Sequence, residues 1–278
     1  MKAKFIADFT SEVEDLVYEK IRQQGGVSAF YDNQVLHLVK IIRDSNSSIE
    51  KKGLAKRELE SFVKVLRQNR YVNPKPRLSR SASTVVEEMA LDMPYYLASQ
   101  GVTSVLSWAG HDIFKTVYDG MIYPMLLSEI RPKTVIELGS GSGGSAIWLA
   151  DIAQINKIDA KIISIDKRKV NVADERVIFR CSDIFQIDSL FTPEEISSLE
   201  HPWLIIEDAH VNVNGVLDFF DSISVSGDYI IVEDSLSKRH ELLKFLDHAN
   251  GEYMLDTKYL DMFGENTTCA MDSILVRQ

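Results

Sequence analysis

The sequence predicts an α/β protein with a doubly wound, mostly parallel sheet and an N-terminal helical region. Short apolar runs alternate with helical stretches from about residue 104 to residue 278. Near-continuous apolar runs of this length are typical of strands that are buried on both faces of a parallel sheet. A glycine-rich turn also follows the first of these runs. Such alternation implies right-handed crossovers between parallel strands.

The strands and helices of this region follow from the apolar runs. Five strands are expected at residues 134–138, 161–166, 176–180, 203–208 and 228–234. A last strand, at residues 272–277, is expected at an edge of the sheet. Helices are expected at residues 146–155 and 213–223.

The N-terminal part has a different, helical periodicity. Apolar residues recur at three- or four-residue spacing between Phe5 and Ile21, and further helices are expected at about 29–42 and 49–68. We expect residues 1–75 to form this helical region, either as a lid or dimerisation element or as a cap over the sheet edge. Pro74, Pro76 and the basic, serine-rich run after them predict a linker over 76–103, or else an ordered excursion, followed by the main domain at 104–278.

Composition excludes several classes of protein. The chain has a formal net charge of −10, which disfavours non-specific binding to nucleic acid or to anionic membranes. It has only two cysteines, Cys181 and Cys269, and no pattern typical of zinc sites or disulfide frameworks. We expect no secretory leader, because the first residues lack a sustained apolar run, and no membrane span, because no segment approaches about 20 apolar residues. We therefore expect a cytoplasmic protein that acts on a small molecule, either as a monomer or as a homo-oligomer.

The glycine-rich turn predicts a nucleotide-like cofactor. Gly139, Gly141 and Gly143 follow a strand and precede a helix, where glycines allow backbone to approach a ligand closely. Glu137, two residues earlier, suits the methionine ammonium or sulfonium of S-adenosylmethionine, whereas it would repel a pyrophosphate. We assign these residues and Ser145, at the end of the loop, to cofactor binding. A plain strand-to-helix turn is the alternative.

Two further acids follow the next strands. Asp166 ends the second strand of the predicted core, where an acid can accept hydrogen bonds from both ribose hydroxyls. Asp183 follows the third strand and is expected to accept from the adenine amino group. Either residue alone could instead be a helix cap. Together with Glu137 and the glycine loop they predict a Rossmann-like cofactor site.

A second acidic group follows the fourth and fifth strands. Asp208 lies after one, and Glu233 and Asp234 lie after the other, so all three meet at the carboxyl edge of a parallel sheet. Hard oxygen ligands of this kind suit Mg²⁺, which would act as a Lewis acid on substrate hydroxyls. We predict these three as metal ligands. The alternative is a set of surface caps.

His210 stands two residues after Asp208. Its ordinary pKa lies near neutrality, so it is a candidate general base for an acceptor hydroxyl. We predict His210 and Asp208 as the catalytic residues. A polar loop residue without a catalytic role is the alternative for His210.

These motifs together resemble the cephalosporin-hydroxylase-like methyltransferases, which include the cephamycin methoxylation component and rhamnosyl O-methyltransferase-like proteins. The resemblance covers about residues 104–278 and rests on four segments, 135–145, 206–210, 227–234 and 261–266. It implies a class I methyltransferase fold, S-adenosylmethionine and often Mg²⁺, held by an acid after the fourth strand and a Glu-Asp pair after the fifth. Asp208, Glu233 and Asp234 match those places.

The resemblance leaves one metal ligand open. Related sugar methyltransferases have an Asp-x-x-His spacing, which Glu207 and His210 match more closely than Asp208 and His210 do. Glu207 is therefore the alternative ligand. The family also places the segment Trp108–Lys115 beside the cofactor, with His111 either starting a helix or contacting substrate.

The predicted function is an S-adenosylmethionine-dependent, Mg²⁺-dependent O-methyltransferase that acts on a sugar or a natural-product intermediate. The acceptor oxygen would displace the sulfonium methyl group directly. Transfer to nitrogen or carbon stays open. An NAD-linked oxidoreductase and a non-catalytic partner protein of a biosynthetic complex are the alternatives.

Overall fold

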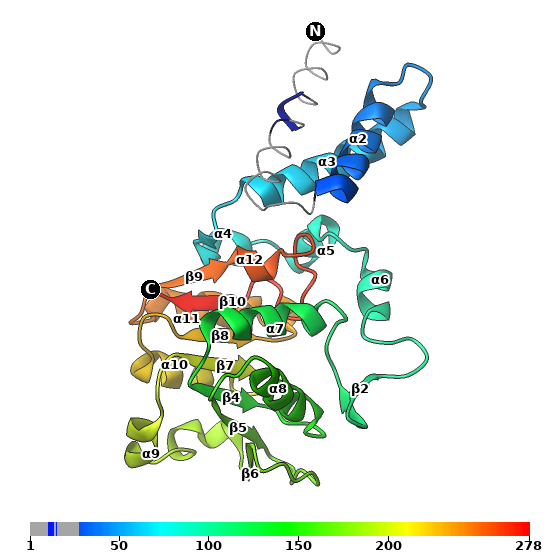
Figure 1. Ribbon diagram of the computed structural model, residues 1–278. Helices are drawn as coiled ribbons and strands as arrows, with labels where there is room; N and C mark the ends of the chain where they lie inside the picture. The colour runs from blue at the N-terminus through cyan, green and yellow to red at the C-terminus, as the bar shows by residue number, and fades with distance from the viewer. Residues whose placement is uncertain (1–10, 14, 16–27) are drawn as a thin grey trace. The chain divides into compact units, whose positions relative to one another are not determined.

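The computed structural model describes residues 11–13, 15 and 28–278, and the chain divides into two compact units, residues 1–68 and 69–278 (Figure 1). Most of the helix expected between Phe5 and Ile21 lies outside the described residues. Within the first unit, α2 (Ser28–Arg43) and α3 (Ile49–Arg67) form where helices were expected. Val35 and Val39 of α2 are buried with Leu59 and Val63 of α3 in a small apolar core.

The second unit is built on a sheet of eight strands in the order β1-β9-β10-β8-β7-β4-β5-β6. Five neighbouring strands, β8, β7, β4, β5 and β6, are parallel, as predicted. The strands are β1 (Tyr71–Val72), β4 (Thr134–Leu138), β5 (Lys161–Asp166), β6 (Val177–Cys181), β7 (Trp203–Glu207), β8 (Tyr229–Val232), β9 (Tyr253–Asp256) and β10 (Ile274–Arg277). The parallel core is a doubly wound, Rossmann-like sheet.

The last strand is expected at an edge of the sheet, but it lies inside the sheet. β10 is inserted antiparallel between β8 and β9, with Leu275 opposite both Ile230 and Leu255. Ile274, Leu275 and Val276 are buried, and such a continuous apolar run suits a strand that is covered on both faces. The edges are formed by β1 and β6 instead.

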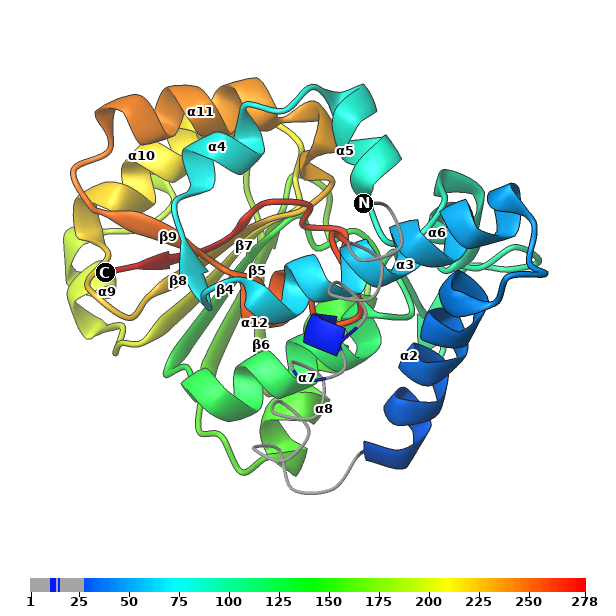
Figure 2. The same ribbon diagram turned by 90° about the horizontal axis from the view of Figure 1, so that it is seen from above.

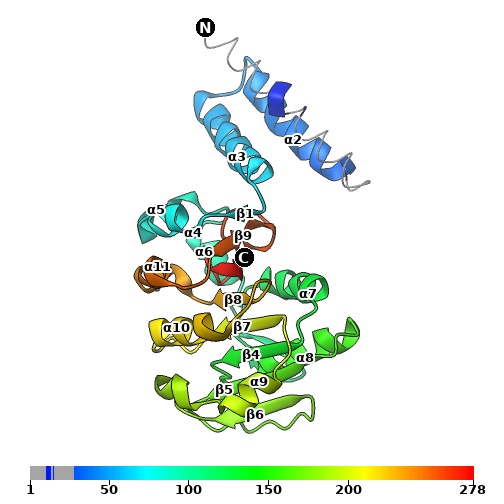
Figure 3. The ribbon, with the colours of Figure 1, turned by 90° about the vertical axis from the view of Figure 1, so that its left-hand side faces the viewer.

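Helices cover both faces of this sheet (Figures 2 and 3). α7 (Asp119–Ile130) and α8 (Gly144–Ile155) pack on one face. α10 (Val213–Ile223) and α11 (Arg239–His248) pack on the other. The four are amphipathic or wholly apolar on the side they turn to the sheet, and their buried residues join one large core with the strands.

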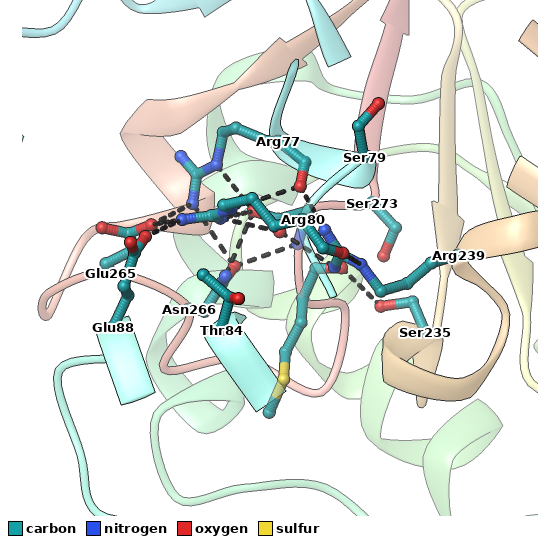
Figure 4. A network of polar contacts seen from close by, with 12 residues as sticks. Arg77, Ser79, Arg80, Thr84, Glu88, Ser235, Arg239, Glu265, Asn266 and Ser273 are labelled. Carbon is teal, nitrogen blue, oxygen red and sulfur yellow. Dashed lines mark hydrogen bonds and ion pairs between the residues drawn. The ribbon is translucent and has the colours of Figure 1, made fainter. Parts of the chain in front are cut away.

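Residues 76–103 are part of the second unit and form an ordered segment there, the alternative to a linker. They form most of α4 (Pro74–Leu78) and all of α5 (Ala82–Glu88) and α6 (Met93–Ala98). A buried ionic network ties this segment to the C-terminal loop (Figure 4). In it, Arg77 and Arg80 donate to Asp272, and Arg77 also donates to Asp261. A serine- and proline-rich sequence is thereby fixed by charge pairing.

The remaining elements are short. They are a hairpin of β2 (Leu106–Trp108) and β3 (His111–Ile113), the 3₁₀ helices η1 (Ile184–Ser189) and η2 (Ser235–Ser237), α9 (Pro193–Ser198) and α12 (Thr257–Leu260). In the part of the chain that the structure describes, no helix combines the length and the apolar character needed to cross a bilayer.

Candidate functional site

The glycine loop lies between β4 and α8 and touches the turn after β7. Gly139 has φ of +106°, and a Cβ built there would lie 2.6 Å from the backbone carbonyl of Asp208. Gly143 also has positive φ, at +89°, and a Cβ there would meet Val170 at 2.7 Å. Side chains are therefore excluded at both positions, and the first keeps the loop against the segment that carries Asp208.

The β2–β3 hairpin borders the same loop. The hydroxyl of Ser142 donates to the backbone oxygen of Asp112 at 3.0 Å. A Cβ at Gly144 would lie 2.3 Å from that oxygen. His111 belongs to β3 and does not start a helix. The segment Trp108–Lys115 thus lies beside the glycine loop.

Glu137 is fully buried under the loop. Its Oε2 accepts a hydrogen bond from the hydroxyl of Ser164, whereas its Oε1 has no hydrogen-bond partner among the described residues. Burial raises the pKa of Glu137, and the Lys115 ammonium opposes that rise. A buried acceptor without a partner is costly unless a ligand supplies the donor.

The other predicted cofactor residues stabilise the turns in which they lie. Asp166 accepts from the backbone amides of Gly141 and Arg168 at 2.9 and 2.8 Å. Asp183 caps η1 by accepting from the amide of Phe185 at 3.1 Å, and that bond holds the pKa of Asp183 below its ordinary value. Ser145 is buried in the first turn of α8. The helix cap that is the alternative to ligand binding is therefore present for Asp183, whereas a loop follows Asp166, which accepts from the amides of two loops.

The turn after β7 separates two neighbouring acids. Glu207 is buried, where it accepts from Lys238 Nζ at 2.6 Å and from the backbone amide of His210 at 3.0 Å. Asp208 lies beside a different set of charged groups, those of Lys115 and His210. Its Oδ1 lies 3.5 Å from His210 Nε2, and its Oδ2 accepts from Lys115 Nζ at 2.7 Å. Of the two candidate ligands, Asp208 is the one that belongs to the exposed acidic group.

Lys115 lies between two of the predicted metal ligands. Its ammonium donates to both Asp208 and Glu233, and Tyr123 donates its hydroxyl to the other oxygen of Glu233. Burial and the adjacent Asp208 carboxylate raise the pKa of Glu233 well above its ordinary value. Burial would also raise the pKa of Asp208, but Lys115 leaves it below the ordinary value. Two carboxylates share one ammonium, so the more deeply buried one is harder to ionise.

Asp234 completes the open side of the group. Asp234 Oδ2 lies 3.5 Å from His210 Nε2. Ligand atoms of Asp208, His210 and Asp234 all lie within 4.8 Å of one another. The side chains of His210 and Asp234 are 49% and 54% exposed. We call Asp208, His210 and Asp234 the open cluster.

The backbone of the open cluster is unusual. His210 and Asp234 both adopt left-handed conformations, with φ of +58° and +46°. Asn212, in the same turn as His210, has φ of +52°. Non-glycine residues in this region carry strain that is commonly found at functional sites.

The sequence did not single out Lys115, Tyr123 or Lys238 as site residues. All three are buried beside acids of the strand ends, where they lie within hydrogen-bond distance of Asp208, Glu233 and Glu207. They come from the segment before α7, from α7 and from the residue before α11. The only available signal was the position of Lys115 at the end of the segment expected beside the cofactor.

Comparison with known proteins shows to which family the chain belongs. The model of the Rhamnosyl O-methyltransferase/CmcI family matches residues 100–254, more than half of the 278-residue chain. The chain belongs to this family. It is therefore an S-adenosylmethionine-dependent methyltransferase, which decides against the NAD-linked oxidoreductase that a glycine loop alone allows.

Two mycobacterial relatives agree with the family match. The chain is 31% identical to Rhamnosyl O-methyltransferase of Mycobacterium leprae over 153 residues, which are 51% of this chain and 66% of that protein. It is 29% identical to Rhamnosyl O-methyltransferase of Mycobacterium bovis over 194 residues, which are 62% of this chain and 78% of that protein.

Solved structures agree with the fold. An apo-structure of CmcI matches with a TM-score of 0.56 at 21% identity, covering 86% of this chain and 98% of that one. A CmcI structure with Mg and S-adenosylmethionine matches with a TM-score of 0.52 at 22% identity, covering 78% and 94%. The second unit of this CmcI-family chain thus has the Rossmann-like fold of class I methyltransferases.

Proposed function

We propose that this protein transfers the methyl group of S-adenosylmethionine to a hydroxyl group of a small molecule, and that the open cluster is where transfer takes place. One observation carries the proposal. The backbone of Asp208 contacts the glycine loop at Gly139, and its side chain reaches His210, which also lies close to Asp234. The cofactor loop and the candidate base are therefore neighbours.

The glycine loop and the acids around it supply the cofactor part of the proposal. We assign Gly139, Gly141, Gly143 and Ser145 to the loop that holds S-adenosylmethionine. Glu137 fits a cationic or amino donor, because its buried Oε1 lacks one. Asp166 and Asp183 remain proposed for the ribose and the adenine, and both have carboxylates that already accept from backbone amides.

The carboxylates supply the metal part of the proposal. Asp208 and Asp234 offer oxygen atoms on the open side, a donor type that Mg²⁺ prefers. Glu233, the third predicted ligand, is held by Lys115 and Tyr123, so its participation requires Lys115 to release it. When bound, Mg²⁺ would polarise hydroxyl groups of the acceptor.

The residues of the chain itself act on the acceptor. His210 accepts the proton of the acceptor hydroxyl at Nε2, and Asp208 and Asp234 stabilise the imidazolium that results. The acceptor oxygen then bonds to the methyl carbon as the carbon–sulfur bond breaks. The products are a methyl ether and S-adenosylhomocysteine. Positioning of the two reactants supplies a large share of the rate enhancement.

The mycobacterial relatives are named for methylation of rhamnosyl groups, which carry neighbouring hydroxyls. Neighbouring hydroxyls can bind a metal ion together. We therefore propose an acceptor with two adjacent hydroxyl groups, such as a sugar or a natural-product intermediate.

Two measurements test the proposed function. Calorimetric titration should show binding of S-adenosylhomocysteine and none of NAD⁺. Methyl-labelled S-adenosylmethionine should then label methyl α-L-rhamnoside or catechol in the presence of Mg²⁺, and labelling should fall after EDTA treatment. Binding of S-adenosylhomocysteine without labelling of any such acceptor would support the non-catalytic alternative instead.

A further inference from the structure

An apolar pocket adjoins the open cluster. Its volume is about 380 Å³, which is at the lower end of the range of about 300–1,000 Å³ that is usual for small-molecule sites. Three parts of the second unit line it: the α5–α6 segment, the η2 turn and the C-terminal loop. The lining residues are Ala82, Met93, Tyr96, Leu97, Asp234, Leu236, Ser237, Cys269 and Met271.

Asp234 belongs to both the pocket and the open cluster. Its side chain lines the pocket, and its Oδ2 lies 3.5 Å from His210 Nε2. A molecule seated in the pocket can therefore present one end to the candidate base without leaving the apolar walls.

Most of the other lining side chains are apolar. Met93, Leu97, Leu236 and Met271 are aliphatic or thioether side chains, and methionines adapt their shape to the group they contact. Cys269 is a buried thiol whose pKa is raised well above its ordinary value by burial, so it behaves as a small apolar group here. Burying apolar surface against such walls is favourable, whereas burying sugar hydroxyls without partners is costly.

The ionic network of Figure 4 fixes the walls of this pocket. Arg80, just before α5, donates to Glu265 and to Asp272. The hydroxyl of Ser235 donates to the backbone oxygen of Met271 at 2.6 Å, which joins η2 to the C-terminal loop. The pocket is therefore held in shape before a ligand enters.

We infer that this pocket binds the apolar part of the methyl acceptor while the reacting hydroxyls face Asp234 and His210. The acceptor class is a hydroxylated ring that bears an alkyl or aryl substituent, in preference to a free sugar. This inference rests on the proposed function and adds the substrate class to it.

A matched series of acceptors tests the inference. Catechol, 4-methylcatechol and 4-butylcatechol share their hydroxyl pair and differ only in apolar length. Binding to the protein saturated with S-adenosylhomocysteine and Mg²⁺ is measured by calorimetry, so the readout does not depend on turnover. We expect affinity to rise by about fourfold for each CH₂ group that the pocket buries.

Two variants test whether the dependence of affinity on chain length arises in this pocket. Ala82→Phe puts a ring into the pocket from an exposed position at the start of α5, and it should remove the dependence on chain length. Ser83→Phe adds the same ring at an exposed neighbour that does not line the pocket, and it should keep that dependence. Both variants should bind S-adenosylhomocysteine as the wild type does.

The outcomes separate the inference from the proposed function. If 4-butylcatechol binds no more tightly than catechol, or if both variants behave alike, the pocket inference is wrong while the proposed function stands. If the wild type does not bind S-adenosylhomocysteine, the proposed function itself fails.

Discussion

Two groups of charged residues in the second unit have similar chemistry and opposite arrangements. The network of Figure 4 sets Arg77, Arg80 and Arg239 against Asp272 and its neighbouring acids. Every described guanidinium in it has a carboxylate partner, and the side chain of Asp272 is fully buried. Beside the open cluster, Asp208 and Glu233 share the ammonium of Lys115, whereas Asp234 lies near His210 with about half of its side chain exposed.

The difference separates two uses of charge. A closed set of pairs stabilises a fold because each charge is compensated where it is buried. Where negative charge exceeds positive charge and faces solvent, as in the open cluster, a positively charged ligand can bind. We therefore expect the first group to govern stability and the second to govern activity.

The largest effect should come from His210. His210→Asn tolerates the left-handed backbone but removes the base, and kcat/KM should fall by about 10²–10⁴-fold, the usual share of general-base catalysis. The midpoint of thermal unfolding should change little because the side chain is half exposed. Methyl transfer and thermal unfolding are measured on the same preparation. His248→Asn, an exposed histidine of α11, is the control and should keep full activity.

The closed network should show the reverse pattern. Asp272 is fully buried, and Asp272→Asn leaves the partly buried Arg77 and Arg80 and the buried Arg239 without their shared partner, so the free energy of unfolding should fall by about 3–5 kcal/mol. Urea denaturation measures this. The control Asp247→Asn removes an exposed pair with Lys75 and should leave the free energy of unfolding nearly unchanged. Equal losses in the two variants would contradict the distinction between the regions.

Substitution of Gly139 should lower both the stability of the protein and its affinity for the cofactor. Gly139→Ala combines unfavourable backbone with a contact at 2.6 Å to Asp208, so it should destabilise by about 1–3 kcal/mol from backbone strain alone and also weaken S-adenosylhomocysteine binding. Gly227→Ala has φ of +93° but no atom within 4 Å of the added Cβ. It should show the backbone strain without the loss of binding. Calorimetric titration of both variants checks this.

Acid should weaken the closed network in a defined range of pH. Burial would raise the pKa of Asp272, but Arg77, Arg80 and Arg239 hold it below the ordinary value. A carboxyl group whose pKa is lowered by folding contributes stability above its unfolded pKa of about 3.9 and loses it as pH falls through the folded pKa. The stability difference between wild type and Asp272→Asn should therefore be constant from about pH 7 to 5 and shrink below about pH 4. A difference that grows in acid would contradict this sign.

Much of the core could be predicted because local pattern and global position agree there. The apolar runs of β4, β5, β7 and β8 are buried on both faces, and that burial is what their composition indicates. The acids after β7 and β8 met at one sheet edge because parallel strands end together. Asp208, His210 and Asp234 were brought together for this reason.

The remainder depended on contacts between distant segments. Residues 76–103 have turn-like composition, but pairing of Arg77 and Arg80 with acids almost 200 positions later holds them in the fold. The position of β10 between β8 and β9 is likewise set by pairing and not by its own sequence. Lys115 was missed as a partner of Glu233 because nothing in a single chain sequence indicates which lysine will be buried between two carboxylates.

The most direct test of the account is single-turnover methyl transfer by Asp208→Asn, compared with the wild type, with saturating S-adenosylmethionine, Mg²⁺ and 4-butylcatechol. Asp208 contacts the cofactor loop through its backbone and the candidate base through its side chain. We predict that the variant still binds S-adenosylhomocysteine but forms labelled methyl ether at least about 100-fold more slowly. Transfer at the wild-type rate would show that the reaction does not take place at the open cluster.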